Sequence, residues 1–137
     1  MVRTLMILTA LVAVAGLAGC THSCNLMYAP SSLVIEIDGA VDAGEWRIEV
    51  DGIGCTVTLP MADEDVPVCD DFAYLDFDAT AIYGLSLESH APDRITITAL
   101  LDGNEVASET RTPAWRESEP NGEGCGVRRQ TTESIAL

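Results

Sequence analysis

Five acidic residues lie close together in the stretch from Met61 to Asp71. They are Asp63, Glu64, Asp65, Asp70 and Asp71. Calcium is a hard cation that takes about six to eight oxygen ligands, so these carboxylates are candidate ligands for Ca²⁺. The stretch lacks the Asp-x-Asp-x-Asp-Gly pattern of a calcium loop. We therefore expect a solvated acidic rim, with a calcium site as the alternative.

A second candidate for chemistry is the set Ser86, Glu88 and His90, which carries the group types of a nucleophile, an acid and a base. Same-face neighbours on one strand are about 7 Å apart, too far for the hydrogen bonds of a catalytic triad. No Gly-x-Ser-x-Gly elbow, phosphate-binding glycine loop or His-Glu-x-x-His motif accompanies them. We expect no catalytic residue and no enzyme activity, and a small hydrolase using His90 is the last alternative.

The two tryptophans differ in their surroundings. Trp46 is in phase with Ile48 and Val50, which predicts a core position. Trp115 lies outside any clean alternation, next to Pro113. It is either a plug at the end of the fold or an exposed platform for a sugar ring or a partner's side chain. We retain Trp115 as the candidate binding-surface residue.

An apolar run at the N-terminus ends in Leu17-Ala18-Gly19-Cys20 and contains one charge, Arg3. The run from Thr4 to Gly19 has sixteen residues, fewer than a membrane-spanning helix needs, and it ends in small residues. This pattern indicates a signal segment, residues 1–19, that is removed. Small residues leading into a cysteine resemble the lipobox of bacterial lipoproteins. That resemblance implies that Cys20 receives a diacylglycerol and becomes the first residue of the mature protein.

The lipoprotein resemblance also implies a location. In many Gram-negative lipoproteins an aspartate after the anchor cysteine retains the protein in the inner membrane, and this chain has Thr21 there. The resemblance therefore points to the outer membrane, with residues 20–32 as a lipidated tether. We expect no cofactor apart from this acyl anchor.

Four further cysteines follow the expected anchor: Cys24, Cys55, Cys69 and Cys125. An even number in an exported protein favours disulfides, and no Cys-x-x-Cys pair suggests a zinc site. Of the three possible pairings we choose Cys55–Cys69 and Cys24–Cys125. The first closes the acidic stretch between two strands, and the second ties the tether to a glycine-rich turn near the C-terminus.

The charge of the chain is strongly one-sided. The 137 residues carry 22 acidic and 7 basic residues, all 7 of them arginines, and a formal net charge of −15. Because Arg3 lies in the expected signal segment and no acidic residue does, the mature part is more negative still. Such a field repels nucleic acid and favours cationic partners. We therefore expect no binding to nucleic acid.

The mature part shows strand patterns and no amphipathic helix. Glu45 to Val50 alternates apolar and charged residues, and Asp51-Gly52 has hairpin-turn chemistry. Similar alternation predicts strands near residues 33–37, 55–59, 72–77, 82–87, 95–101 and 105–111, with an edge strand at 127–132. Seven or eight short strands at regular spacing predict an all-β, disulfide-stapled antiparallel β-sandwich over residues 33–137.

The stretch from Ala43 to Gly52 also resembles the Gly-x-Tyr/Trp-x-Val-x-Val hairpin of transthyretin-like and carboxypeptidase-regulatory-like modules. We expect an immunoglobulin-like or transthyretin-like sandwich. From Leu33 to Cys125 the chain resembles small bacterial lipoproteins with a cysteine-stapled sandwich, and this resemblance implies no activity.

These observations predict a lipid-anchored protein of the bacterial envelope that acts as a non-enzymatic interaction or structural module. Its expected partners are the membrane, through the anchor, and a protein or glycan. A calcium-dependent adhesion or carbohydrate-binding module is the second hypothesis. The loops at 61–71 and 114–123 are the expected contact surfaces.

Overall fold

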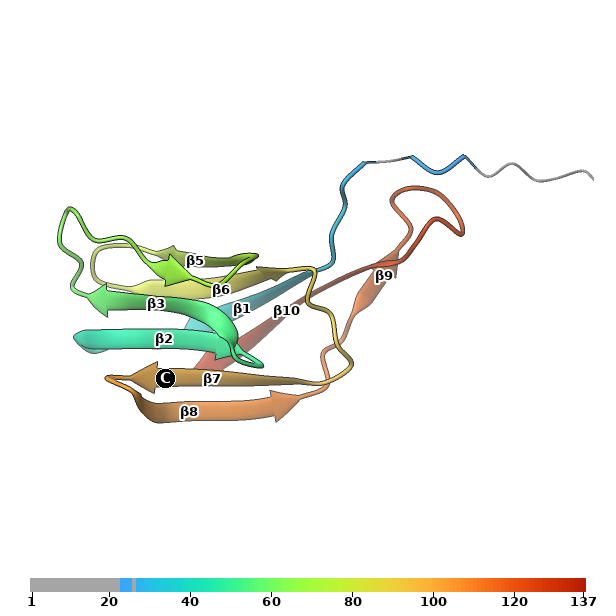
Figure 1. Cartoon of the computed structure of the whole chain (residues 1–137). Helices are drawn as coiled ribbons and strands as arrows, with labels where there is room; N and C mark the ends of the chain where they lie inside the picture. The colour runs from blue at the N-terminus through green and yellow to red at the C-terminus, as the bar shows by residue number, and fades with distance from the viewer. Residues whose placement is uncertain (1–22, 26) are drawn as a thin grey trace, which may run out of the picture.

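The computed structural model describes residues 23–25 and 27–137, and it shows two five-stranded sheets packed face to face (Figure 1). The expected signal segment and Cys20 lie outside the described residues. The ten strands are β1 (Ser32–Asp38), β2 (Gly44–Val50), β3 (Ile53–Leu59), β4 (Val68–Cys69), β5 (Ala73–Phe77), β6 (Ile82–Glu88), β7 (Ile95–Leu101), β8 (Asn104–Arg111), β9 (Arg116–Ser118) and β10 (Arg128–Ala136). The chain is thus a small all-β sandwich, as the alternating patterns predicted.

Each sheet combines strands that follow one another in sequence with strands that are distant in sequence. Sheet A has the order β5-β6-β1-β10-β9, and sheet B has the order β4-β3-β2-β7-β8. All neighbours are antiparallel except β1 and β10, which run parallel with Ser32 opposite Gln130 and Asp38 opposite Ala136. The parallel pair joins strands from the two ends of the described chain.

The core forms where the inward positions of the two sheets meet. In β2, Trp46, Ile48 and Val50 point inward and are almost fully buried, as their spacing predicted. The largest fully buried side chains come from six strands and are Leu33, Ile35, Ile48, Val50, Cys55, Leu85, Leu87, Ile95, Ile97 and Ile135. Each such side chain contributes about 1.5–3 kcal/mol relative to an exposed one, so burial of these positions determines which face of each strand points inward.

Two hairpins have the same turn. Asp51-Gly52 joins β2 to β3, and Asp102-Gly103 joins β7 to β8. All four residues have positive φ, between 51° and 86°. Two-residue loops of this conformation match the right-handed twist of the flanking strands, and Asp-Gly is a preferred pair for them. Local turn chemistry therefore sets the register of both hairpins.

The strand number and one strand position differ from the sequence prediction. Two strands, β4 and β9, have only two and three residues, too few for an alternating pattern to reveal them. The segment predicted as an edge strand is β10, which is nine residues long and lies between β1 and β9. Its inward positions include Thr131 and Glu133, opposite Leu33 and Ile35, so its apolar pattern is weak although the strand has a neighbour on each side.

Candidate functional site

The connections between strands gather at two opposite ends of the sandwich (Figure 1). Since β1 begins where the N-terminal tether arrives, we call that end the tether end and the other the distal end. The tether end contains residues 23–31 and the connections 51–52, 70–72, 89–94, 112–115 and 119–127. The distal end contains the connections 39–43, 60–67, 78–81 and 102–103.

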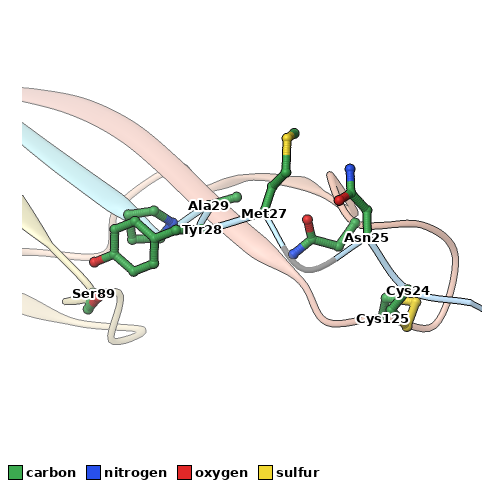
Figure 2. A pocket seen from close by; sticks show the side chains of 9 residues that line it. Cys24, Asn25, Met27, Tyr28, Ala29, Ser89 and Cys125 are labelled. Atoms are coloured by element: carbon green, nitrogen blue, oxygen red, sulfur yellow. A yellow bond between two sulfur atoms is a disulfide. The ribbon is translucent and has the colours of Figure 1, made fainter.

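The tether is held against the connection between β9 and β10. A disulfide joins Cys24 to Cys125, with Cα atoms 5.5 Å apart (Figure 2). The backbone N–H of Asn25 donates to the carbonyl of Asn121 at 3.0 Å. Further along, Arg128 Nε donates to the carbonyl of Pro30 at 2.9 Å. The tether is therefore fixed to the sandwich from its first described residues, and this cysteine pair is the one chosen from the sequence.

A cavity of about 440 Å³ lies between the tether and the connection 119–127. Met27 and Tyr28 line it and are largely exposed, and the Cys24–Cys125 disulfide forms one wall (Figure 2). Asn121 also lines it, and its buried Oδ1 has no hydrogen-bond partner among the described residues. The cavity is open, and the described residues that line it are apolar or uncharged polar.

Five of the six arginines beyond Arg3 lie at the tether end: Arg94, Arg111, Arg116, Arg128 and Arg129. Arg129 pairs with Asp93 and with Glu117, each at 2.9 Å, and these hydrogen bonds raise the pKa of its guanidinium. Arg111 pairs with Glu109 and with the inward-facing Glu133. These pairs connect β8, β9, β10 and the connection 89–94, so their role is structural.

The distal end carries carboxylates and no basic residue. None of its four connections contains Arg, Lys or His. The acidic side chains there are Asp42, Asp63, Glu64, Asp65, Asp78 and Asp102. Charge is thus distributed unevenly: arginines are interspersed with acids at one end, and acids stand alone at the other.

The five candidate calcium ligands are divided between two places. Asp65 accepts from the backbone N–H of Ala62 at 3.0 Å and shapes the tip of the distal connection. Asp70 follows β4 and lies beside Gly54 of β3. Within residues 23–25 and 27–137, no group of three or more His, Cys, Asp or Glu side chains is arranged to hold a metal ion.

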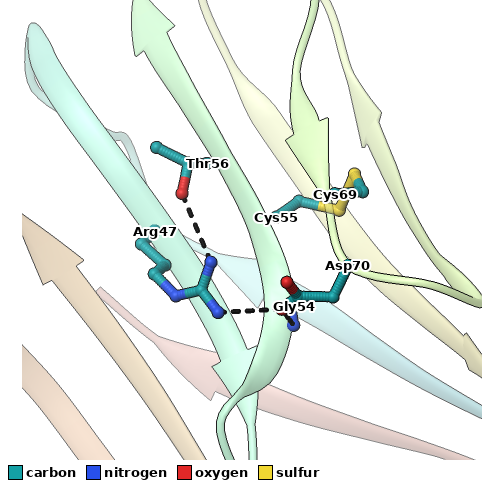
Figure 3. Close-up of a disulfide and its surroundings, with 6 residues drawn as sticks. All are labelled: Arg47, Gly54, Cys55, Thr56, Cys69 and Asp70. Atoms are coloured by element: carbon teal, nitrogen blue, oxygen red, sulfur yellow. Dashed lines mark hydrogen bonds and ion pairs between the residues drawn. A yellow bond between two sulfur atoms is a disulfide. The ribbon is translucent and has the colours of Figure 1, made fainter.

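Asp70 belongs to a network around the second disulfide, Cys55–Cys69, whose Cα atoms are 4.0 Å apart (Figure 3). Its Oδ2 accepts from the backbone N–H of Gly54 and from Arg47 Nη2, each at 2.9 Å. The Gly54 hydrogen bond, followed by the Arg47 hydrogen bond, lowers the pKa of Asp70. Arg47 also donates to Glu49 at 2.6 Å. The network and the disulfide together fasten β4 to the edge of sheet B.

The structure separates Ser86, Glu88 and His90. Ser86 lies on the outer face of sheet A, opposite Val34, whereas Glu88 accepts from the Tyr28 hydroxyl at 3.4 Å. His90 is in the connection after β6, and its Nε2 is 2.8 Å from Asp51 Oδ2. The hydrogen-bonding partner of His90 is therefore Asp51, and neither Ser86 nor Glu88.

Trp115 is half-buried and packs against the core at the tether end. Its indole N–H donates to the carbonyl of Pro92 at 2.8 Å. The ring therefore closes the space between the sheets near the connection 89–94, which is the geometry of a plug.

The outer face of sheet A has a groove of about 360 Å³ that the sequence did not predict. It lies over β1 and β6 and is lined by Glu36, Asp38, Asp76, Tyr83, Gly84 and Ser86. The sequence does place Glu36 and Asp38 opposite the apolar face of β1, but it does not reveal that β6 lies between β1 and β5. That neighbour relation creates the groove.

Comparison with known proteins gives no match among family models, curated proteins or solved structures. Among the residues that the structure describes, no helix is long and apolar enough to cross a membrane.

Proposed function

We propose that this chain is a lipid-anchored protein of the bacterial envelope whose sandwich acts as a non-enzymatic interaction or structural module. The observation that carries the proposal is the fixed tether. Cys24 lies four residues after Cys20 and is bonded to Cys125. At about 3.5 Å per residue, the sandwich is held within roughly 14 Å of the acylated residue. An anchor at Cys20 thus presents one end of the sandwich to the membrane and the other end to the surroundings.

The charge distribution supports the same orientation. Carboxylates are the only charged side chains of the distal connections. An anionic lipid surface repels them within about one Debye length, roughly 8–10 Å. The distal end therefore faces away from the membrane, where a cationic partner can reach it. Residue 21 is Thr21 and not the aspartate that retains many lipoproteins in the inner membrane. By the lipoprotein resemblance, this residue supports an outer-membrane location.

The non-enzymatic part of the proposal is supported by the separate positions of Ser86, Glu88 and His90, each of which has its own structural neighbours. The candidate carboxylates are likewise used as turn and strand contacts at Asp65 and Asp70. An interaction module needs accessible loops on a rigid scaffold, and the β-sandwich with its exposed connections provides both.

Replacing the acylated residue tests the anchor. Wild-type protein should partition into the detergent phase, and Cys20→Ser should stay unprocessed or enter the aqueous phase, because the acyl chains are the expected source of membrane affinity. Thr21→Ala is the matched control, since it keeps Cys20. Partitioning of Cys20→Ser like wild type, as a processed protein, would show that the anchor proposal is wrong.

Crosslinking in native envelopes tests the interaction role. The variant with Asp63→Asn, Glu64→Gln and Asp65→Asn should recover less of any crosslinked partner than wild type, since it removes the carboxylates of the longest distal connection. Neutralising Glu88, Glu119 and Glu123 at the tether end changes the net charge equally and serves as the control. Equal recovery from both variants would contradict a role for the distal end.

A further inference from the structure

The groove on sheet A is centred on a residue without a side chain. Gly84 of β6 pairs with Glu36 of β1 on one side and with Asp76 of β5 on the other. All three residues are on the outer face of the sheet, because the positions that alternate with them, such as Ile35 and Leu85, are buried in the core. Paired residues of antiparallel strands lie about 4.5–5.5 Å apart, so one carboxylate stands on each side of the hollow.

The hollow is required by the packing of β1 against β6. A Cβ atom added to Gly84 would lie 2.7 Å from the carbonyl oxygen of Ile35, closer than such atoms approach in proteins. No other residue fits at position 84 without displacing backbone. The floor of the groove is therefore a built-in feature of the sheet and not a gap that a side chain could fill.

The walls of the groove are acidic and aromatic. Glu36, Asp38 and Asp76 are exposed, and none of them forms an ion pair within the described part of the chain. Tyr83 is 51% exposed, and its hydroxyl donates to Asp78 Oδ2 at 2.5 Å. That hydrogen bond holds the tyrosine ring in place beside the groove.

We propose that this groove binds an arginine side chain in a basic segment of a partner protein. The three carboxylates form no ion pair and no described lining residue is basic, so charge complementarity favours a cation. A guanidinium is planar, donates up to about five hydrogen bonds and stacks on aromatic rings, so it matches a slot with a carboxylate on each side and a tyrosine wall. This inference deepens the proposed interaction role by assigning the chemistry of the partner.

The outer face beyond the groove can accommodate the rest of an extended segment. The next row across the strands holds Val34, Ser86 and Tyr74, with no charged side chain among them. Ser86 and the exposed Tyr74 offer hydroxyl groups for backbone hydrogen bonds. The groove therefore selects the arginine, and the neighbouring row receives the chain that carries it.

An NMR titration of the ¹⁵N-labelled full chain in detergent micelles tests the proposal. The probes are the blocked peptide acetyl-Gly-Arg-Gly-amide and its citrulline counterpart, which has the same shape without the charge. The arginine peptide should shift the amide signals of Gly84, Glu36 and Asp76, and the citrulline peptide should not. Glu36→Gln and Asp76→Asn should each weaken binding about threefold to tenfold, because each removes one charge-assisted contact.

Glu105→Gln is the matched control, since it removes one exposed carboxylate from β8 in sheet B and so changes the net charge equally. Equal weakening by Glu105→Gln would overturn the proposal in favour of general electrostatic attraction. Equal binding of the citrulline peptide, or shifts at Gly84 with maltotriose but not with the arginine peptide, would overturn it as well. Any of these results leaves the detergent partitioning of the wild type unchanged, so failure of the groove proposal is distinguishable from failure of the anchor proposal.

Discussion

Asp78 is the residue whose ionisation the structure perturbs most clearly. Its Oδ2 accepts from Tyr83, and its Oδ1 accepts from the backbone N–H groups of Thr80 at 2.7 Å and Ala81 at 2.8 Å. These hydrogen bonds, led by that of Tyr83, lower the pKa of Asp78 from 3.8 to about 2. The charged carboxylate is therefore the form that the folded turn favours.

Removing the Tyr83 hydroxyl should raise the pKa of Asp78 towards 3.8. Because the folded pKa lies below the unfolded one, the contribution of Asp78 to stability is fully present above about pH 4 and is lost as the pH falls towards 2. Tyr83→Phe should make that loss smaller. A ¹³C carboxyl NMR titration measures the pKa, with Tyr74→Phe as an exposed-tyrosine control. An unchanged Asp78 pKa in Tyr83→Phe would contradict the assignment of Tyr83 as the main cause.

Sequence patterns identified individual residues better than their partners. The acidic stretch is visible in the sequence, but the separation of Asp70 from Asp63, Glu64 and Asp65 depends on contacts with Gly54 and Arg47. The His90–Asp51 pair spans 39 positions and was not anticipated. No local pattern encodes such pairs, because they depend on which connections meet at the same end of the sandwich.

The short strand β4 depends on the Cys55–Cys69 disulfide more than on its own pairing. It pairs with β3 through only two residues, and both of its residues are exposed. The double variant Cys55→Ala, Cys69→Ala should lower the free energy of unfolding by about 3 kcal/mol, the chain-entropy value for a loop of about 15 residues. Urea denaturation measures this change.

Hydrogen exchange gives a local test of the same disulfide. The backbone N–H of Asp70 donates to the carbonyl of Gly54 at 2.9 Å. In the double variant this amide should lose protection, whereas the amide of Ile97 in β7, which lies between β2 and β8, should remain protected. Equal loss at both amides would indicate global destabilisation instead of release of β4.

Strands with a strict alternation were predicted correctly, whereas β10, which has polar inward positions, was predicted only as a shorter edge strand. In β2 the residues Trp46, Ile48 and Val50 identify the inner face unambiguously. In β10 the inward Glu133 is accommodated by Arg111, a contact between strands that no pattern within β10 can indicate. The two shortest strands, β4 and β9, exist only through tertiary pairing.

The proposed anchor and the uneven distribution of charge together predict how the molecule is oriented on a membrane surface. With the wild-type chain on vesicles that contain gadolinium-chelating lipid, the amide signals of residues 121–126 should broaden strongly. Signals of residues 62–66 should broaden little, because these residues are at the opposite end of the sandwich. Similar broadening of both segments would contradict the proposed orientation, in which the tether end faces the membrane and the distal end faces away from it. A vesicle sample without gadolinium is the control.

The parallel pairing of β1 with β10 has a consequence for the order of folding. Ser32 is paired with Gln130, so nearly the whole domain separates two strands that lie side by side in sheet A. Contacts of such long sequence separation slow folding, since the chain must close a large loop before it gains them. Sheet A also lacks an interior strand and the buried Ile135 until β10 is present. The domain therefore cannot complete its native fold before its last strand has been synthesised, and until then β1 has no partner on the side that β10 occupies.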